Sequence, residues 1–163
     1  MMEFTFAMIK PDAVIANNSG KIIDMIEKNG FEILRMHKVH IDEETAREFY
    51  AEHKDKPFFT ELVDFICSTP VIIMALGKEN AIKDWRNLMG ATDSRKAEKG
   101  TVRSLFGTDI GKNAVHGSDS AEAAEAELGL FFVDSSDEDE FEEGDLEFCD
   151  EDDCSKDDEC CKD

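Results

Sequence analysis

The pattern of apolar and polar positions predicts a chain of alternating strands and helices up to about residue 133. Alternating or continuous apolar positions predict strands at residues 3–10, 31–41, 70–76 and 113–116. Apolar positions at helical spacing predict helices at residues 21–29, 58–67, 79–88 and 119–128, and one from its cap Asp42 to about Tyr50. The glycine-bounded stretch 90–100 has no hydrophobic period, which is typical of a loop. The order is ferredoxin-like, so we expect an α+β fold: a βαββαβ antiparallel sheet covered by helices, with additional helices.

Charge divides the chain into two parts. Residues 134–163 carry 17 acidic and 2 basic side chains, whereas residues 1–133 carry 22 acidic and 16 basic ones. The second part cannot bury enough apolar surface to offset its ordering entropy, so we predict a folded domain at 1–133 and a disordered acidic tail at 134–163. The net charge of −21 disfavours nucleic acid and anionic membranes as partners. A nucleotide pocket in such a chain must therefore supply its own cations.

Two further features indicate the compartment. The start of the chain has no basic segment followed by a long apolar core, and the apolar run 71–76 is too short to span a bilayer, so we expect a soluble cytosolic protein. An odd number of cysteines without a signal peptide argues against a secreted disulfide framework. We expect Cys67 to be a core residue. The acidic tail contains four cysteines, which are Cys149, Cys154, Cys160 and Cys161. Two interpretations of them stay open: a site for soft metals and, as the favoured one, a flexible tail that aids solubility.

The segment 113–120, NAVHGSDS, is the strongest candidate for chemistry. His116 follows a short apolar step and precedes Gly117, which permits close approach of a backbone or an anion. Helix-capping residues follow, with Gly129 as the expected end of the helix, so His116 is predicted beside a helix N-terminus that favours phosphate. A neutral imidazole there is a candidate phosphoryl acceptor, and the alternative is a hydrogen-bonded turn histidine.

Five ordered blocks carry a resemblance to a known family. NAVHGSDS resembles the signature of nucleoside diphosphate kinases, in which the histidine becomes phosphorylated. The resemblance covers about residues 3–133, and its other blocks are KPD at 10–12, KDKPFF at 54–59, WRNLMGAT at 85–92 and GTVR at 100–103. It implies an enzyme that moves the γ-phosphate of a nucleoside triphosphate, mainly ATP, to a diphosphate by a ping-pong mechanism.

The resemblance also implies roles for individual residues. His116 is the nucleophile, Glu127 holds its other ring nitrogen, Ser118 lies near the moving phosphate and Tyr50 lies near the histidine. Read without the family, Glu127 is an exposed helix residue, and that alternative stays open.

Further matched positions correspond to the nucleotide. Those that match phosphate-binding positions are Lys10, Arg86, Thr92 and Arg103. Asn113 matches the residue that contacts the sugar, and Phe58 matches the aromatic face on which the base stacks, with Ile110 on its other side. We expect either Phe58 or Phe59 to be a core residue. Stacking reads no base edge, so purines and pyrimidines are both expected to bind.

Neither a P-loop nor a Rossmann motif is present in the sequence. Mg²⁺ is expected to arrive with the nucleotide phosphates, with Asp119 as the nearby carboxylate. The family forms tetramers and hexamers, so a homo-oligomer is expected. Ser94 and Lys99 stand where the family often has prolines, which puts the assembly and stability of the loop 90–100 in doubt. Two other functions stay open: phosphate transfer from His116 to a protein, and a nucleotide-binding scaffold without turnover.

Overall fold

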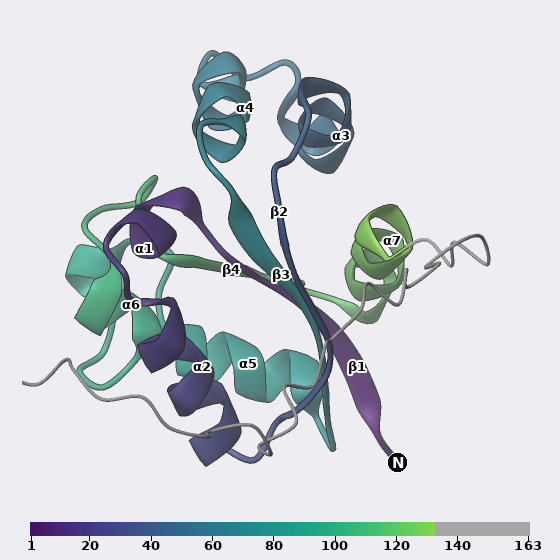
Figure 1. The fold of residues 1–163 in the computed structure, drawn as a ribbon, viewed down its shortest axis with the longest axis vertical. Coiled ribbons are helices and arrows are strands. Elements are labelled where there is room, and N and C mark those ends of the chain that lie inside the picture. Colours follow the sequence, from purple (N-terminus) through teal and green to yellow (C-terminus); the bar gives the residue numbers. More distant parts are fainter. Residues whose placement is uncertain (133–163) are drawn as a thin grey trace, which may run out of the picture. The chain divides into compact units, whose positions relative to one another are not determined.

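Strands from four separate stretches of the chain form one antiparallel sheet in the described part of the protein. The structure is a computed structural model, and residues 1–132 are those it describes. The strands are β1 (Glu3–Ile9), β2 (Glu32–Val39), β3 (Val71–Lys78) and β4 (Val115–Gly117), in the spatial order β2-β3-β1-β4 (Figure 1). This confirms the predicted ferredoxin-like α+β fold.

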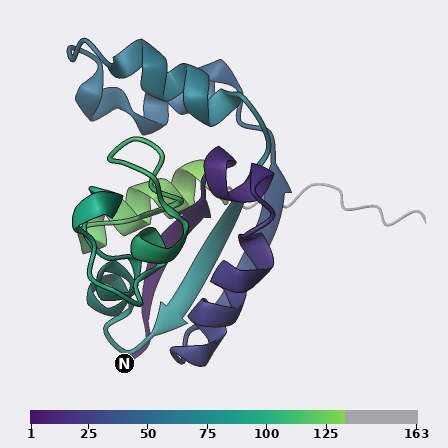
Figure 2. The same ribbon diagram turned by 90° about the vertical axis from the view of Figure 1, so that its left-hand side faces the viewer.

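Helices cover both faces of this sheet (Figures 1 and 2). They are α1 (Pro11–Ile15), α2 (Ser19–Lys28), α3 (Glu43–Phe49), α4 (Phe59–Cys67), α5 (Ala81–Met89), α6 (Val102–Phe106) and α7 (Ala121–Phe131), with single 3₁₀ turns at Ala51–His53 and Ser94–Lys96. Helices α2, α5 and α6 bury one core against the sheet, and α3, α4 and α7 bury the other. Strand β1 lies between them: Phe6 and Met8 enter one core, whereas Ala7 and Ile9 enter the other. Because both faces are covered, its apolar positions are continuous rather than strictly alternating.

Two five-residue helices were not predicted, although each carries a start signal. Pro11 occupies the first position of α1, where its fixed φ is compatible with a helix and its missing N–H costs nothing. The hydroxyl of Thr101 accepts a hydrogen bond from the backbone N–H of Ser104 and caps α6. Helices this short contain too few turns to establish an apolar period, so the pattern alone does not reveal them.

The predicted end of the last helix was wrong. Gly129 lies inside α7, which continues to Phe131, and Ser120 caps the start of the helix by accepting the N–H of Ala123. The Phe131 ring stacks on Phe6 with centroids 4.9 Å apart. This packing outweighs the low helix propensity of a single glycine.

No helix within residues 1–132 is long and apolar enough to cross a membrane. The predictions for the acidic tail and its cysteines lie outside the described residues. Cys67 is partly buried at the end of α4, against the second core.

Candidate active site

His116 is held by a carboxylate from the last helix. The residue lies in the middle of β4, where it pairs with Met8 of β1. Its Nε2 lies 2.9 Å from Oε1 of Glu127, and the hydroxyl of Ser118 donates to Oε2 of the same carboxylate at 2.5 Å. A carboxylate beside Nε2 favours the tautomer that carries its proton there. Nδ1, the other ring nitrogen, then has a free lone pair, and no group within residues 1–132 is hydrogen-bonded to it.

The surroundings of the imidazole favour its neutral form. The ring of Phe49 meets it edge to face at a centroid distance of 4.9 Å, and that of Phe6 lies 6.1 Å away. Burial lowers the pKa of His116, and Lys10 and Arg103 act in the same direction, against the opposing effect of Glu127. A neutral ring with a free lone pair is the form that a nucleophile requires.

The sequence analysis did not select Phe49 as a site residue. Its ring lies against His116, where Tyr50 was expected. The Tyr50 ring packs against Phe49 with centroids 4.8 Å apart, behind the ring that meets the imidazole. Burial, together with Cys67 and Glu127, raises the pKa of the Tyr50 hydroxyl. The amphipathic helix predicts that one of two adjacent aromatic residues faces the core, but not which one meets His116.

Two buried cations lie near the histidine. Lys10 follows β1, and its Nζ donates to Oδ1 of Asn113 at 2.8 Å. Burial and the charge of Arg103 lower the pKa of Lys10 to about 8. The guanidinium of Arg103 donates to the carbonyls of Gly90 (2.9 Å) and Val115 (3.1 Å), and its Nε is buried without a partner among the described residues.

A third cation completes this group. Burial and the charge of Arg86 lower the pKa of Arg103 to about 10. Arg86 itself is exposed, and its Nη1 donates to the backbone oxygen of Asp119 at 3.4 Å. Each of the two buried cations has its pKa lowered in part by another cation, so the site is poised to gain free energy from an anion.

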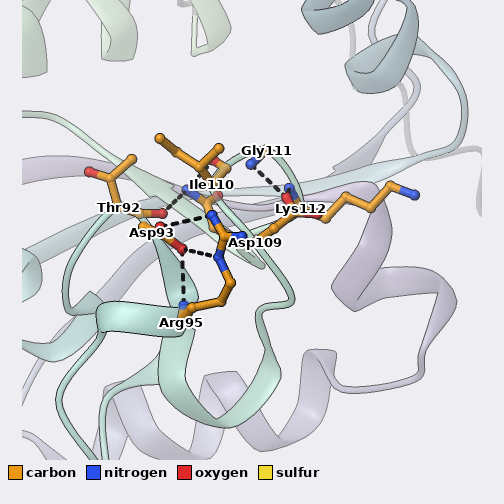
Figure 3. Close-up of polar contacts among 8 residues, drawn as sticks. Thr92, Asp93, Arg95, Asp109, Ile110, Gly111 and Lys112 are labelled. Atoms are coloured by element: carbon orange, nitrogen blue, oxygen red, sulfur yellow. Dashed lines mark hydrogen bonds and ion pairs between the residues drawn. The ribbon is translucent and has the colours of Figure 1, made fainter.

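Asn113 connects this cationic group to two loops, the loop 90–100 and the loop 107–112 between α6 and β4. Its Nδ2 donates to the carbonyls of Thr92 (3.0 Å) and Ile110 (3.2 Å), which leaves Oδ1 for Lys10. Both carbonyl contacts lie where the loops approach each other (Figure 3). Asn113 is only 2% exposed, so its amide is fixed in a single orientation by three partners.

Each loop has an acidic residue that accepts several hydrogen bonds within it (Figure 3). Asp93 binds the guanidinium of Arg95 with both carboxylate oxygens, at 2.9 and 3.0 Å. Asp109 accepts the backbone N–H groups of Gly111 and Lys112, both at 2.8 Å.

Ser94 and Lys99, the departures from the family pattern, have different settings. Ser94 is buried, and its N–H donates to the carbonyl of Asp109 at 3.4 Å, so it helps to join the two loops. Lys99 is exposed.

The aromatic pair that follows Pro57 is divided between solvent and core. Phe58 is 44% exposed just before α4, and the Nζ of Lys56 lies 5.7 Å from its ring centroid. Phe59 packs against the second core. Ile110 is 61% exposed on its loop. The side chains of Phe58, Ile110 and Tyr50 lie outside the hydrogen-bonded network around His116, and the roles expected for them stay predictions.

Gly117 permits a close approach of a different kind from the one expected. A Cβ at this position would lie 2.3 Å from Nε1 and 2.4 Å from Cδ1 of Trp85. The indole Nε1 donates to the carbonyl of His116 at 3.4 Å. The glycine therefore accommodates the indole that supports the histidine backbone.

Asp119 is exposed at the rim, beside Arg86. Within residues 1–132, no group of three or more His, Cys, Asp or Glu side chains is arranged to hold a metal ion. The expected place of Asp119 near a nucleotide-borne Mg²⁺ stays a prediction.

Comparison with known proteins identifies the family. A sequence model described as nucleoside diphosphate kinase matches residues 3–136. The chain belongs to the nucleoside diphosphate kinase family. The nucleoside diphosphate kinase of Geotalea uraniireducens is 53% identical over 131 residues, which cover 80% of this chain and 96% of the relative. That of Histophilus somni is 48% identical over 134 residues, covering 82% and 95%.

Solved structures of nucleoside diphosphate kinases share the fold. The enzyme from Aquifex aeolicus superposes with a TM-score of 0.79 at 42% identity, covering 82% of this chain and 97% of that one. The Halobacterium salinarum enzyme, solved in complex with CDP, superposes with a TM-score of 0.80 at 44% identity, covering 85% and 95%. The family that the five sequence blocks predicted is thereby confirmed, and its members are kinases, which are phosphotransferases.

Proposed function

We propose that this nucleoside diphosphate kinase family member transfers the γ-phosphate of a nucleoside triphosphate to a nucleoside diphosphate through phosphorylated His116. The observation that carries the proposal is the state of this histidine: Nε2 is bound by Glu127, while Nδ1 is free in a ring whose pKa is lowered by burial. In the first half-reaction, Nδ1 forms a bond to the γ-phosphorus. The bond from phosphorus to the bridging oxygen breaks, and the diphosphate leaves with its electron pair. A second diphosphate then takes the phosphate back by the reverse step.

The side chains around His116 stabilise this transfer in separate ways. The Glu127 carboxylate balances the positive charge that develops on the imidazole as Nδ1 bonds to phosphorus. Ser118 binds Glu127 and keeps it oriented, a positioning role that differs from the expected place beside the phosphate. Lys10, Arg86 and Arg103 are the cations that we assign to the phosphate oxygens.

We assign the rest of the nucleotide to the two loops and to Phe58. We assign the sugar to Asn113 and a further phosphate contact to Thr92, on the family match, and the exposed Phe58 ring offers a stacking face, with Ile110 opposite. Mg²⁺ bound to the nucleotide would neutralise phosphate charge, with Asp119 as its protein carboxylate. Stacking predicts tolerance of both purines and pyrimidines with ATP as the main donor, and the CDP complex of the Halobacterium salinarum relative supports the acceptance of a pyrimidine.

The test is to incubate the protein with γ-labelled ATP and magnesium and then to add unlabelled GDP. We expect an acid-labile protein phosphate that moves to GDP at once, is absent in His116→Ala and is retained in the control His40→Ala, whose ring is exposed beyond β2. Label that stays on the protein in GDP but moves to a protein acceptor would favour phosphotransfer to a protein. Nucleotide binding without any label would favour the scaffold.

We also propose that residues 1–133 suffice for this chemistry and that the acidic tail, 134–163, is dispensable. The described site residues all lie before position 128. Truncation after Val133 is expected to keep the rate of phosphate transfer, measured in the same assay. Loss of most turnover would show that the tail takes part.

A homo-oligomer, tetramer or hexamer, in the cytosol is the expected working form. Apolar side chains exposed on β1 and β2 support self-association: Phe4 is 49%, Leu34 42% and Met36 47% exposed. Light scattering of the purified protein would determine the number of subunits.

A further inference from the structure

The backbone two residues before His116 takes a conformation that alanine rarely adopts. Ala114 has φ of +70°, in the left-handed region, and its side chain is fully buried. The N–H of Val115 donates to the carbonyl of Asn113 at 2.8 Å, which closes a three-residue γ-turn around Ala114. This form of γ-turn is rare and strained, and such strain persists only where the surrounding structure maintains it.

The segment just after β1 holds this turn from both sides. Oδ2 of Asp12 accepts the N–H of Ala114 at 3.0 Å, and the N–H of Lys10 donates to the carbonyl of Ala114 at 2.8 Å. The other carboxylate oxygen of Asp12 is buried and accepts no hydrogen bond within residues 1–132. Burial raises the pKa of Asp12, and its bond to Ala114 acts against this effect. The carboxylate thus binds the Ala114 N–H, while the N–H groups of Asp12 and Ala13 and the charge of Lys10 also favour its ionised form.

The turn also connects the parts of the proposed site. Asn113 precedes it and receives the ammonium of Lys10. Val115 follows it, accepts Arg103 through its carbonyl and leads directly to His116. A change at Ala114 would therefore alter the direction of the Asn113 amide and of the first residue of β4 together.

We propose that Asp12 is a positioning residue for phosphotransfer, because it holds the strained Ala114 turn that orients Asn113 and His116. The inference rests on the proposed function above. The competing role is one in which the negative charge of Asp12 acts on Lys10, whose pKa it raises, and the neutral Asp12→Asn variant separates the two.

The test is a cycle of variants in which the rate constant of phosphohistidine formation is measured in a single turnover at saturating ATP and magnesium. A rate constant does not depend on the fraction of protein that is folded, so loss of stability alone would not change it. The variants are Asp12→Ala, Asp12→Asn, Ala114→Gly and the double variant Asp12→Ala with Ala114→Gly. Asp24→Ala, which removes an exposed carboxylate paired with Lys28 on α2, is the control.

Asp12→Ala is expected to slow phosphorylation by roughly 10- to 100-fold, as a small displacement of a nucleophile does. Asp12→Asn is expected to lower the rate constant by less than about fivefold, because the amide oxygen of asparagine can still accept a hydrogen bond from the Ala114 N–H. In the Ala114→Gly protein, Asp12→Ala is expected to cost less than about threefold, because glycine adopts positive φ without steric cost.

Three results would overturn the inference while leaving the proposed function intact. They are a fast Asp12→Ala protein, an Asp12→Asn protein as slow as Asp12→Ala, and an undiminished effect of Asp12→Ala in the Ala114→Gly background. A wild-type protein that takes up no label would instead refute the proposed function, and the role of Asp12 with it.

Discussion

We predict that Lys10 sets an alkaline limit to activity that an exposed lysine would not set. Its side chain is 8% exposed, and burial with the nearby Arg103 lowers its pKa from 10.5 to about 8. If the ammonium binds the phosphate, the free enzyme is active only while Lys10 is protonated. Activity is therefore full below the pKa and falls as the pH rises through about 8.

The size of the effect follows from this pKa. One pH unit above it about one molecule in ten retains the proton, and two units above it about one in a hundred. Since kcat/KM reports the ionisation of the free enzyme, it is expected to fall about tenfold between pH 7 and pH 9 and about 100-fold by pH 10. Saturating nucleotide is expected to move this limit upward in kcat, because phosphate charge favours the ammonium form.

The assay is phosphate transfer from ATP to GDP with kcat/KM measured from pH 6.5 to 10. In Lys10→Arg the fall between pH 7 and pH 9 is expected to disappear, because a guanidinium stays charged over that interval, although the rate at pH 7 is reduced by the different geometry. Lys21→Arg, a change at an exposed position of α2, is the control and is expected to keep the fall. A flat wild-type profile up to pH 10, or an unchanged fall in Lys10→Arg, would refute the assignment.

Three other substitutions test separate parts of the site. Glu127→Ala is expected to lower kcat by about 100-fold, because the developing charge on His116 loses its counter-charge; rapid-quench measurement of phosphohistidine formation checks this, and an unchanged rate would contradict it. Phe58→Ala is expected to raise KM for purine and pyrimidine nucleotides alike and to retain kcat at saturation, because one stacking contact contributes roughly 1–3 kcal/mol of binding free energy. A higher KM for one kind of base alone would contradict non-specific stacking. Gly117→Ala places a methyl group 2.3 Å from the Trp85 indole, so calorimetry should show destabilisation by about 1–3 kcal/mol, and an unchanged Tm would show that the indole moves aside.

The sequence was most informative where a period repeats or a cap is strong. The apolar patterns of 3–10 and 31–41 predicted β1 and β2 to within two residues, and Asp42 caps α3 as expected by accepting the N–H of Thr45. The end of α7 was mispredicted because a contact with Phe6, more than 120 positions earlier, extends the helix past Gly129. Local pattern contains no information on such a contact.

The candidate site shows the same division between local and distant information. Motif resemblance selected Lys10 and Asn113, and the structure brings them to 2.8 Å across a separation of 103 residues. The resemblance gave no role of its own to Asp12, because its hydrogen bond depends on the turn at Ala114. It also did not select Phe49, because the contact of that ring depends on the position of His116. Positive φ at an alanine leaves no mark in sequence, because nothing about the residue type indicates it.

The chain is strongly acidic, yet its candidate site contains buried cations. The free energy that burial of Lys10 costs the folded state explains how such a site could bind an anion. Below pH 8 Lys10 is charged in both the folded and the unfolded chain, and its lowered pKa then corresponds to a cost of about 3 kcal/mol to the folded state. As the pH rises from about 8 to 10.5, the folded chain releases this proton first and the cost disappears. A bound phosphate anion reduces the same cost at neutral pH by pairing with the ammonium. If the proposed role of Lys10 holds, this cost becomes binding free energy for the nucleotide, so that a protein with a net charge of −21 would still bind a polyanionic substrate at its buried cations.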